Sequence, residues 1–303
     1  MKNESAQDRI GNGVRPACPL CKSSGVSLAY QKESFGVFRC PYCTLVFEWP
    51  QLSEQAVQKL YGNSYYESWG IEQDPSVREM KKRTFELKLR AIEKVVSPGR
   101  ILDVGCATGF FLEAAAERGW QAYGVEVNPY AVEQARKQFG DRVIEGTIGS
   151  KQLDGLSFDA IAMSDVLEHV YDPLEALCRA NELLRDGGLV AITTPNIAGL
   201  AALIFRSRWP HLKAEHQFYF SPRTLSDLLT RAGFRVLSLK SAVKALSLNY
   251  IFSQRAVSRV PLLTPLASAL HSILPVSLRQ KPLYLYTGET FVVAEKIRAP
   301  GRL

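Results

Sequence analysis

The sequence predicts an α/β fold that follows a small metal-binding module. From Gly99 onward, short apolar segments alternate with amphipathic segments, the pattern of a mostly parallel sheet covered by helices. The first apolar segment, 101–104, leads through a glycine-bearing turn into a helix. Nearer the N-terminus, two Cys-x-x-Cys pairs are separated by 18 residues. The chain has 303 residues, which is enough for one full α/β domain and an appended module.

The two cysteine pairs predict a structural zinc site. Cys18 and Cys21 form the first pair, Cys40 and Cys43 the second, and each pair has the form Cys-Pro-x-Cys. The segments 26–30 and 36–39 between them are expected to be short strands. Four thiolates at this spacing surround one tetrahedral Zn²⁺, as in a zinc ribbon. We therefore expect a disordered tail over 1–13, a zinc ribbon over 14–50, and a linker with a helical cap over 51–98.

The turn 101–109 indicates a nucleotide-like ligand, and three classes of ligand compete for it. A phosphate loop needs Gly-Lys-Ser/Thr, but Gly109 is followed by two phenylalanines. A dinucleotide fingerprint needs Gly-x-Gly-x-x-Gly, whereas the sequence has Gly105-x-x-x-Gly109. Asp103 would repel a pyrophosphate but suits an ammonium group. The residues therefore favour S-adenosylmethionine (SAM).

A second strand over 121–127 supports this ligand. It ends near Glu126, which lies 23 residues after Asp103, close to the offset of about 20 at which a carboxylate reaches ribose hydroxyls. Val127 and Asn128 follow it and are expected to line the same site. With these motifs the chain resembles class I SAM-dependent methyltransferases from about Gly99 to Lys296. Ala107 stands where many members have a third glycine.

The resemblance implies a Rossmann-like sheet of seven strands in the order 3-2-1-4-5-7-6, with the last strand antiparallel. The SAM-binding domain then covers 99–298. It also places Thr147 near the adenine amine, and Ser164 and Asp165 at the ligand edge of the fourth strand. The remaining strands are expected at 142–145, 158–163, 189–194, 234–239 and 290–296.

Two histidines are candidates for the base that removes a proton from the methyl acceptor. His169 and His216 follow the fourth and fifth strands, where ligands bind in open α/β sheets. Glu168 could orient His169, share a divalent ion with it, or cap a helix, and the helix cap is the simplest of these roles. The sequence Leu-Glu-His-Val resembles that of small-molecule methyltransferases. The Asn/Asp-Pro-Pro-aromatic sequence of nucleobase and amide methyltransferases is absent at this position.

A basic and apolar insertion, 241–286, is expected between strands six and seven. The chain has no Asp or Glu from Leu228 through Gly288 and a net charge of +7. Three prolines divide its apolar runs, which suggests short amphipathic helices in a lid, a homodimer contact, or a peripheral contact with an anionic membrane. Nucleic acid is the least favoured partner, because the segment has few aromatic residues for base stacking.

The sequence therefore predicts a SAM-dependent methyltransferase that acts on a hydroxyl of a small-molecule, glycan or lipid-linked acceptor. Methylation of a sugar carbon, an RNA methyltransferase, and a non-catalytic SAM-binding partner protein remain alternatives. No secretion signal or spanning segment stands out in the sequence, so we expect a cytoplasmic protein or one at the inner face of the membrane.

Overall fold

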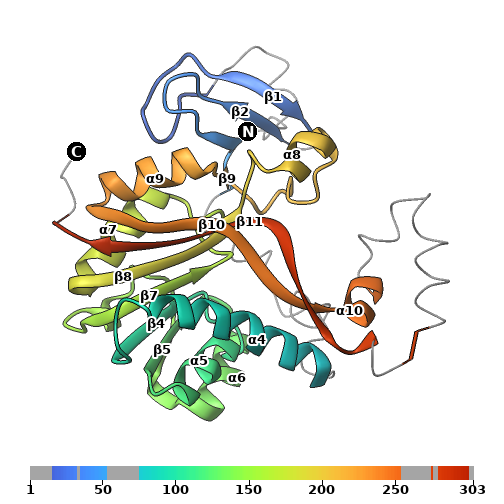
Figure 1. Ribbon diagram of the computed structural model, residues 1–303. Helices are drawn as coiled ribbons and strands as arrows, with labels where there is room; N and C mark the ends of the chain where they lie inside the picture. The colour runs from blue at the N-terminus through green and yellow to red at the C-terminus, as the bar shows by residue number, and fades with distance from the viewer. Residues whose placement is uncertain (1–15, 33–34, 53–74, 254–273, 276–278, 300–303) are drawn as a thin grey trace.

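The computed structural model describes residues 16–32, 35–52, 75–253, 274–275 and 279–299 (Figure 1). The expected N-terminal tail, most of the linker ahead of Pro75 and the centre of the basic insertion lie outside the described residues.

The central sheet has seven strands in the spatial order β10-β11-β8-β7-β4-β5-β6. Counted along the chain, this is the predicted order 3-2-1-4-5-7-6. Neighbouring strands from β6 to β8 run parallel, and β11 is antiparallel to both β8 and β10. The strand bounds are β4 Arg100–Val104, β5 Gln121–Glu126, β6 Val143–Glu145, β7 Phe158–Ser164, β8 Leu184–Pro195, β10 Phe234–Ser247 and β11 Pro282–Lys296.

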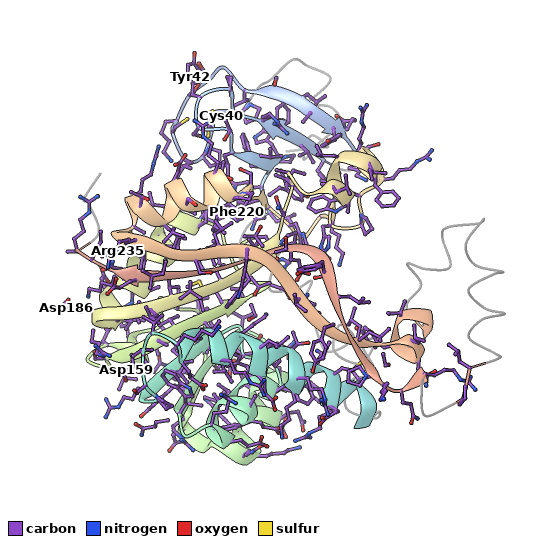
Figure 2. All side chains as sticks on the ribbon, viewed as in Figure 1. Cys40, Tyr42, Asp159, Asp186, Phe220 and Arg235 are labelled. Carbon is purple, nitrogen blue, oxygen red and sulfur yellow. The ribbon has the colours of Figure 1, made fainter. Side chains whose placement is uncertain are left out.

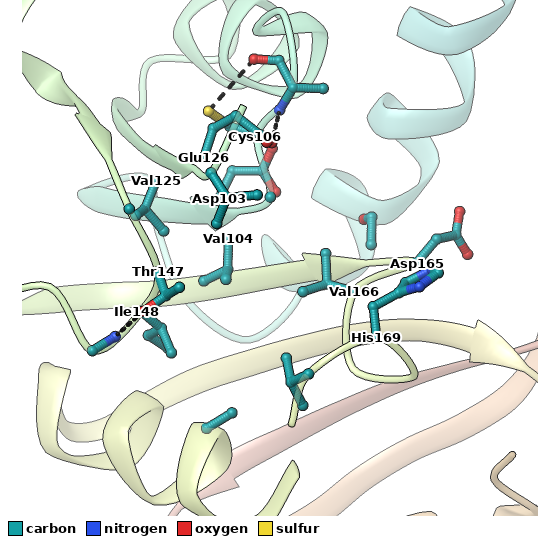
Figure 3. Close-up of a pocket in the computed structure, with 18 of the residues that line it drawn as sticks. Asp103, Val104, Cys106, Val125, Glu126, Thr147, Ile148, Asp165, Val166 and His169 are labelled. Carbon is teal, nitrogen blue, oxygen red and sulfur yellow. Dashed lines mark hydrogen bonds between the residues drawn. The ribbon is translucent and has the colours of Figure 1, made fainter. Parts of the chain in front are cut away.

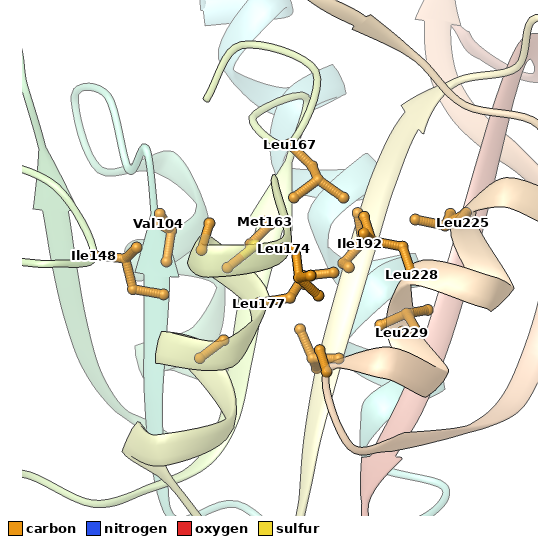
Figure 4. Packing of buried hydrophobic residues seen from close by; sticks show 14 of the residues in the cluster. Val104, Ile148, Met163, Leu167, Leu174, Leu177, Ile192, Leu225, Leu228 and Leu229 are labelled. Atoms are coloured by element: carbon orange, nitrogen blue, oxygen red, sulfur yellow. The ribbon is translucent and has the colours of Figure 1, made fainter. Parts of the chain in front are cut away.

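Helices cover both faces of this sheet. One face packs against α4, α5 and α6, and the other against α7 and α9 (Figures 1 and 4). Fully buried leucines such as Leu177 and Leu229 join α7 and α9 to strand residues such as Ile192. The helix bounds are α4 Pro75–Ile92, α5 Phe110–Glu117, α6 Pro129–Phe139, α7 Pro173–Leu183 and α9 Pro222–Arg231.

Side-chain caps fix where three of these helices begin. Asn128, Asp172 and Ser221 each accept a hydrogen bond from a backbone N–H of the first turn, and each precedes a proline at the first helical position. Proline there removes no intrahelical hydrogen bond and is already in the helical range of φ. The helices therefore begin where the sequence places a cap and a proline side by side.

The N-terminal module forms a second sheet with the order β1-β2-β3-β9. The first three strands belong to the module: β1 Ser27–Gln31, β2 Gly36–Arg39 and β3 Val46–Trp49. The fourth, β9 Phe218–Tyr219, comes from the loop that follows β8 in the larger domain. The two units therefore share a sheet, and a common apolar core that includes Val46, Trp209 and Tyr219.

The strands on either side of the expected insertion are longer than predicted. Residues 241–247 continue β10 and residues 282–286 continue β11, and the two extensions pair with each other. Helix α4 supports them, because Thr84 Oγ1 accepts the Ala245 N–H at 2.9 Å. The short helix α10 Leu248–Ser253 follows, and α8 Leu200–Phe205 lies after β8. Among the described helices, none is long and apolar enough to cross a membrane.

Candidate active site

A cavity of about 670 Å³ opens at the carboxyl ends of β4, β5 and β7 (Figure 3). Nine of the residues expected at the site line it: Asp103, Gly105, Ala107, Glu126, Val127, Thr147, Ser164, Asp165 and His169. Gly109, Asn128 and His216 are not among the lining residues. The structure thus brings together segments that are far apart in the sequence.

The turn after β4 needs its glycine. Gly105 has φ 71°, and a Cβ atom there would lie 2.6 Å from a methyl group of Val166. Ala107 also has a positive φ, 48°, in the left-handed region that costs an L-residue about 1–2 kcal/mol. This backbone conformation explains why a glycine is common at the position of Ala107. Gly109, with φ 97°, precedes the first residue of α5.

Glu126 holds the turn in place. One carboxylate oxygen accepts the Ala107 N–H at 2.9 Å, and the other accepts the Asn128 N–H at 2.9 Å. Asn128 itself is buried, and its side chain accepts the Ala131 N–H at 2.9 Å. Asn128 therefore shapes the site by capping α6, while Glu126 lines the cavity with lone pairs that can also accept ribose hydroxyls.

Asp103 is a buried carboxyl group at the floor of the cavity. It is 3% exposed, and its Oδ1 has no hydrogen-bond partner among the described residues. Burial raises its pKa well above the ordinary value, against the opposite influence of Lys88. An ammonium group in the cavity would supply the missing partner and favour the ionised carboxylate. The residues present therefore fit the amino group of SAM.

The turn 146–149, which follows β6, forms one wall of the cavity. The Thr147 hydroxyl accepts the Gly149 N–H at 3.2 Å, and Ser150 Oγ accepts the Thr147 N–H at 3.1 Å. Thr147 lines the cavity, but its hydroxyl also stabilises its own turn. Gly146, Ile148 and Gly149 contribute to the same wall.

An ionic cluster lies at the end of β7, and no sequence motif indicates it. Its Glu289 is buried and Lys244 is half-buried, whereas Asp165 is 41% exposed. Lys244 Nζ lies 3.2 Å from an Asp165 oxygen and 2.6 Å from a Glu289 oxygen. Lys88 donates to Ser164 Oγ at 3.0 Å. The two carboxylates hold the pKa of Lys244 above its ordinary value despite burial. Lys244 is one of several cations in an acid-free stretch, so nothing local distinguishes it from a solvated lysine.

The two candidate histidines lie together. Their ring centroids are 4.6 Å apart in an edge-to-face arrangement. His169 donates from Nδ1 to the Glu215 carbonyl at 2.8 Å when it is in the Nδ1–H tautomer. Burial lowers the pKa of both imidazoles, most strongly for His216. Both are therefore neutral near pH 7, and of the two only His169 lines the cavity.

Glu168 does not cap a helix, which corrects the role that the sequence favoured. Asp172 caps α7, and Glu168 is 1% exposed and accepts a hydrogen bond from Thr194 Oγ1 at 2.9 Å. Burial raises the pKa of Glu168 well above the ordinary value. Its ligand atoms and those of both histidines lie within 4.8 Å of one another, a spacing that fits a shared divalent ion.

Among the cavity residues that were not expected from the sequence are Gln217 and Lys81. Gln217 lines the cavity, and its side-chain Nε2 donates to the backbone carbonyl of His169 at 3.2 Å. The backbone carbonyl of Gln217 accepts the Glu48 N–H of the N-terminal module at 2.8 Å. Lys81 on α4 also lines the cavity, and burial lowers its pKa to about 8. A weak indication in the sequence that Gln217 belongs to the site is its position directly after His216.

The four cysteines of the N-terminal module form a compact cluster. Cys18 Sγ lies 3.5 Å from Cys43 Sγ, and Cys21 Sγ lies 3.5 Å from Cys40 Sγ. All four sulfur atoms lie within 4.8 Å of one another. Tetrahedral Zn–S bonds of about 2.3 Å place sulfur atoms about 3.8 Å apart, so the cluster fits a zinc ribbon. The other two cysteines, Cys106 and Cys178, lie outside it.

Similar structures share this fold. Magnesium protoporphyrin IX methyltransferase (ChlM) from Synechocystis PCC 6803, with bound SAH, aligns over 80% of this chain and 100% of its own at 12% identity and a TM-score of 0.52. The plantazolicin methyltransferase BpumL in complex with SAH aligns over 80% of this chain and 94% of its own at 17% identity and a TM-score of 0.50. At these identities the likeness concerns the fold alone.

Sequence comparison identifies the family. The ubiquinone biosynthesis O-methyltransferase of Cereibacter sphaeroides is 30% identical over 172 residues, which is 52% of this chain and 70% of the relative. The protein of the same name from Xanthomonas campestris pv. campestris is 34% identical over 110 residues, 34% of this chain and 46% of its own. A family model described as a methyltransferase domain matches residues 76–239. The chain therefore belongs to the methyltransferase-domain family and is a class I SAM-dependent methyltransferase.

Proposed function

We propose that this enzyme transfers the methyl group of SAM to a hydroxyl group of a small-molecule, glycan or lipid-linked acceptor. The observation that carries the proposal is the neutral imidazole of His169 on the wall of the cavity. A hydroxyl is a weak nucleophile until it loses its proton, so O-methylation needs a base at the site of transfer. The names of the relatives, which are O-methyltransferases, support the same assignment.

The residues of the cavity would bind SAM from both ends. Asp103 would accept from its ammonium group, because Oδ1 has no other partner among the described residues. Glu126 would accept from the ribose hydroxyls while it still holds the Ala107 N–H. SAM supplies an electrophilic methyl group on a sulfonium centre. The protein's contribution is therefore to align the acceptor oxygen in line with that bond and to exclude water.

His169 would take the acceptor's proton. With Nδ1–H donating to the Glu215 carbonyl, Nε2 carries the lone pair and accepts the proton as the new oxygen–methyl bond forms and the sulfur–methyl bond breaks. Gln217 would hold the backbone of His169 through its hydrogen bond to the His169 carbonyl. His216 packs against His169 and keeps its ring in place.

The N-terminal module would hold a structural Zn²⁺ through Cys18, Cys21, Cys40 and Cys43. A closed four-thiolate site leaves no position for substrate. Its effect on the reaction would be indirect, because β3 pairs with β9, directly after His216 and Gln217. The ion would stabilise a module whose strand β3 holds β9, the strand that follows His216 and the cavity residue Gln217.

The test is transfer of labelled methyl from SAM, with acceptors from an extract of the source cells, followed by cleavage of the product with hydriodic acid. Hydriodic acid releases the methyl group of an ether as volatile methyl iodide and leaves a carbon-bound methyl in place. We expect volatile label, and a loss of about 100-fold in turnover for His169→Gln with unchanged SAM binding. Non-volatile label, or label in RNA, would overturn the assignment, and the absence of transfer to any acceptor would favour a non-catalytic SAM-binding protein.

A further inference from the structure

Helix α8 has an apolar face that is open to solvent. Leu200, Leu203 and Ile204 are 73%, 61% and 64% exposed, and Phe205 is 47% exposed. Leu200, Leu203 and Ile204 have the i, i+3, i+4 spacing that places side chains on one side of a helix. Four neighbouring exposed apolar side chains differ from the scattered single ones that ordinary surfaces carry, and such a cluster marks an interaction site.

The opposite side of α8 is anchored in the protein. Ala202 is 2% exposed and packs into the core shared with the N-terminal module, next to Trp209. Just before α8, the Asn196 N–H donates to the Gly288 carbonyl of β11 at 3.1 Å. The exposed face is therefore anchored at the carboxyl edge of the sheet, near Gly288 of β11.

Positive charge borders this apolar face. Arg206 and Arg208 follow α8 directly, and both are exposed. The chain has no Asp or Glu from Gly187 through Ala214. At the opposite, amino edge of the sheet the surface instead mixes both signs, with Asp159, Asp186 and Arg235 (Figure 2).

A second copy of the chain is a poor occupant for this surface. In a two-fold symmetric dimer the patch would face itself. Arg206 and Arg208 would then approach the same residues of the partner, with no carboxylate along 187–214 to pair with them. A face of exposed aliphatic and aromatic side chains bordered by arginines instead matches the boundary between lipid headgroups and acyl chains.

We infer that the α8 surface, formed by Leu200, Leu203, Ile204, Phe205, Arg206 and Arg208, docks onto an anionic lipid membrane. The apolar side chains enter the headgroup layer and the arginines contact lipid phosphates. The segment after these arginines continues to Gln217, which lines the cavity. Docking would thus place the active-site loop next to the bilayer.

The experiment is co-sedimentation of the full chain with vesicles of phosphatidylcholine containing phosphatidylglycerol. We expect binding that weakens about tenfold in the double variant Leu203→Ser/Ile204→Ser. For Arg206→Gln/Arg208→Gln we expect weaker binding and a smaller dependence on salt. The control is Val95→Ser/Leu237→Ser, which replaces two side chains that are 53% and 39% exposed away from α8 and should bind like the wild type.

Vesicle binding is measured without methyl transfer, so its outcome is independent of the proposed reaction. Equal binding by Leu203→Ser/Ile204→Ser and the control would overturn the inference, as would an absence of binding by the wild type. Light scattering provides a second readout. If the wild type is a dimer, and the α8 variant a monomer with unchanged vesicle binding, then the surface is a contact between copies and the inference is wrong.

Discussion

Glu48 gives the folded protein a stability that falls as the pH rises. This carboxyl group is 2% exposed on β3, and its Oε2 has no hydrogen-bond partner among the described residues. Burial, and then the nearby charge of Glu215, raise its pKa from about 4.5 to about 9. The substitution Glu48→Gln keeps the shape of the side chain and removes the proton equilibrium.

The direction of this pH dependence follows from the number of protons that each state binds. Between these two pKa values the folded chain holds a proton on Glu48 that the unfolded chain has lost, so the free energy of unfolding decreases with pH. Each pH unit contributes about 1.4 kcal/mol. Between pH 5.5 and pH 8.5 the wild type should therefore lose up to about 4 kcal/mol that Glu48→Gln retains.

Urea unfolding at several pH values between these limits measures the effect, with the N-terminal module monitored by hydrogen exchange. We expect the difference in stability between the two proteins to be smallest at the acidic end and to grow in favour of Glu48→Gln towards the alkaline end. Glu133→Gln, which changes an exposed carboxylate on α6, is the control and should show no such difference. A difference between wild type and Glu48→Gln that does not change with pH would refute the reasoning.

Three other substitutions or treatments test separate parts of the structure. Ala107→Gly should raise the free energy of unfolding by about 0.5 kcal/mol, because the relief of the positive φ exceeds the entropy that glycine adds to the unfolded chain. A lower free energy of unfolding for the variant in urea would mean that Ala107 is not strained. Lys244→Met should destabilise by up to about 3 kcal/mol, because it leaves the buried carboxyl group of Glu289 without its cation. Its control is Lys240→Met on the exposed side of the same strand, and equal melting temperatures of the two variants would contradict a stabilising ion pair between Lys244 and Glu289. Chelation of zinc should increase hydrogen exchange over 16–52 and leave 100–145 unchanged, whereas an unaltered N-terminal module would argue against a structural ion.

Features that the sequence predicted well are those set by local chemistry. The turn after β4 needs glycine at positive φ and a carboxylate at the strand end, so Asp103, Gly105 and Glu126 are visible as a motif. The paired cysteines are equally local. The sheet order has no local signal and was predicted only because the chain resembles a known family.

Features that the sequence did not reveal depend on contacts between distant segments. Strand β9 has two residues, and it pairs with β3, more than 160 residues earlier in the chain. No propensity or periodicity identifies so short a strand. Glu168 could be a cap, a ligand or an orienting group, and only the position of Thr194 on β8 decides which hydrogen bond it makes. Lys244 is distinguished from its basic neighbours by its contacts with Asp165, which follows β7, and Glu289 on β11.

The most direct test of the account is calorimetric titration of SAM into wild type, Glu126→Ala and Glu145→Ala. Glu126 and Glu145 are register partners on β5 and β6, but Glu145 is exposed and does not line the cavity. We expect one SAM site, an affinity about tenfold or more lower for Glu126→Ala, and unchanged affinity for Glu145→Ala. Melting curves establish that both variants are folded. No binding of SAM to the wild type, or equal binding by Glu126→Ala, would contradict the assignment of this cavity as the SAM site.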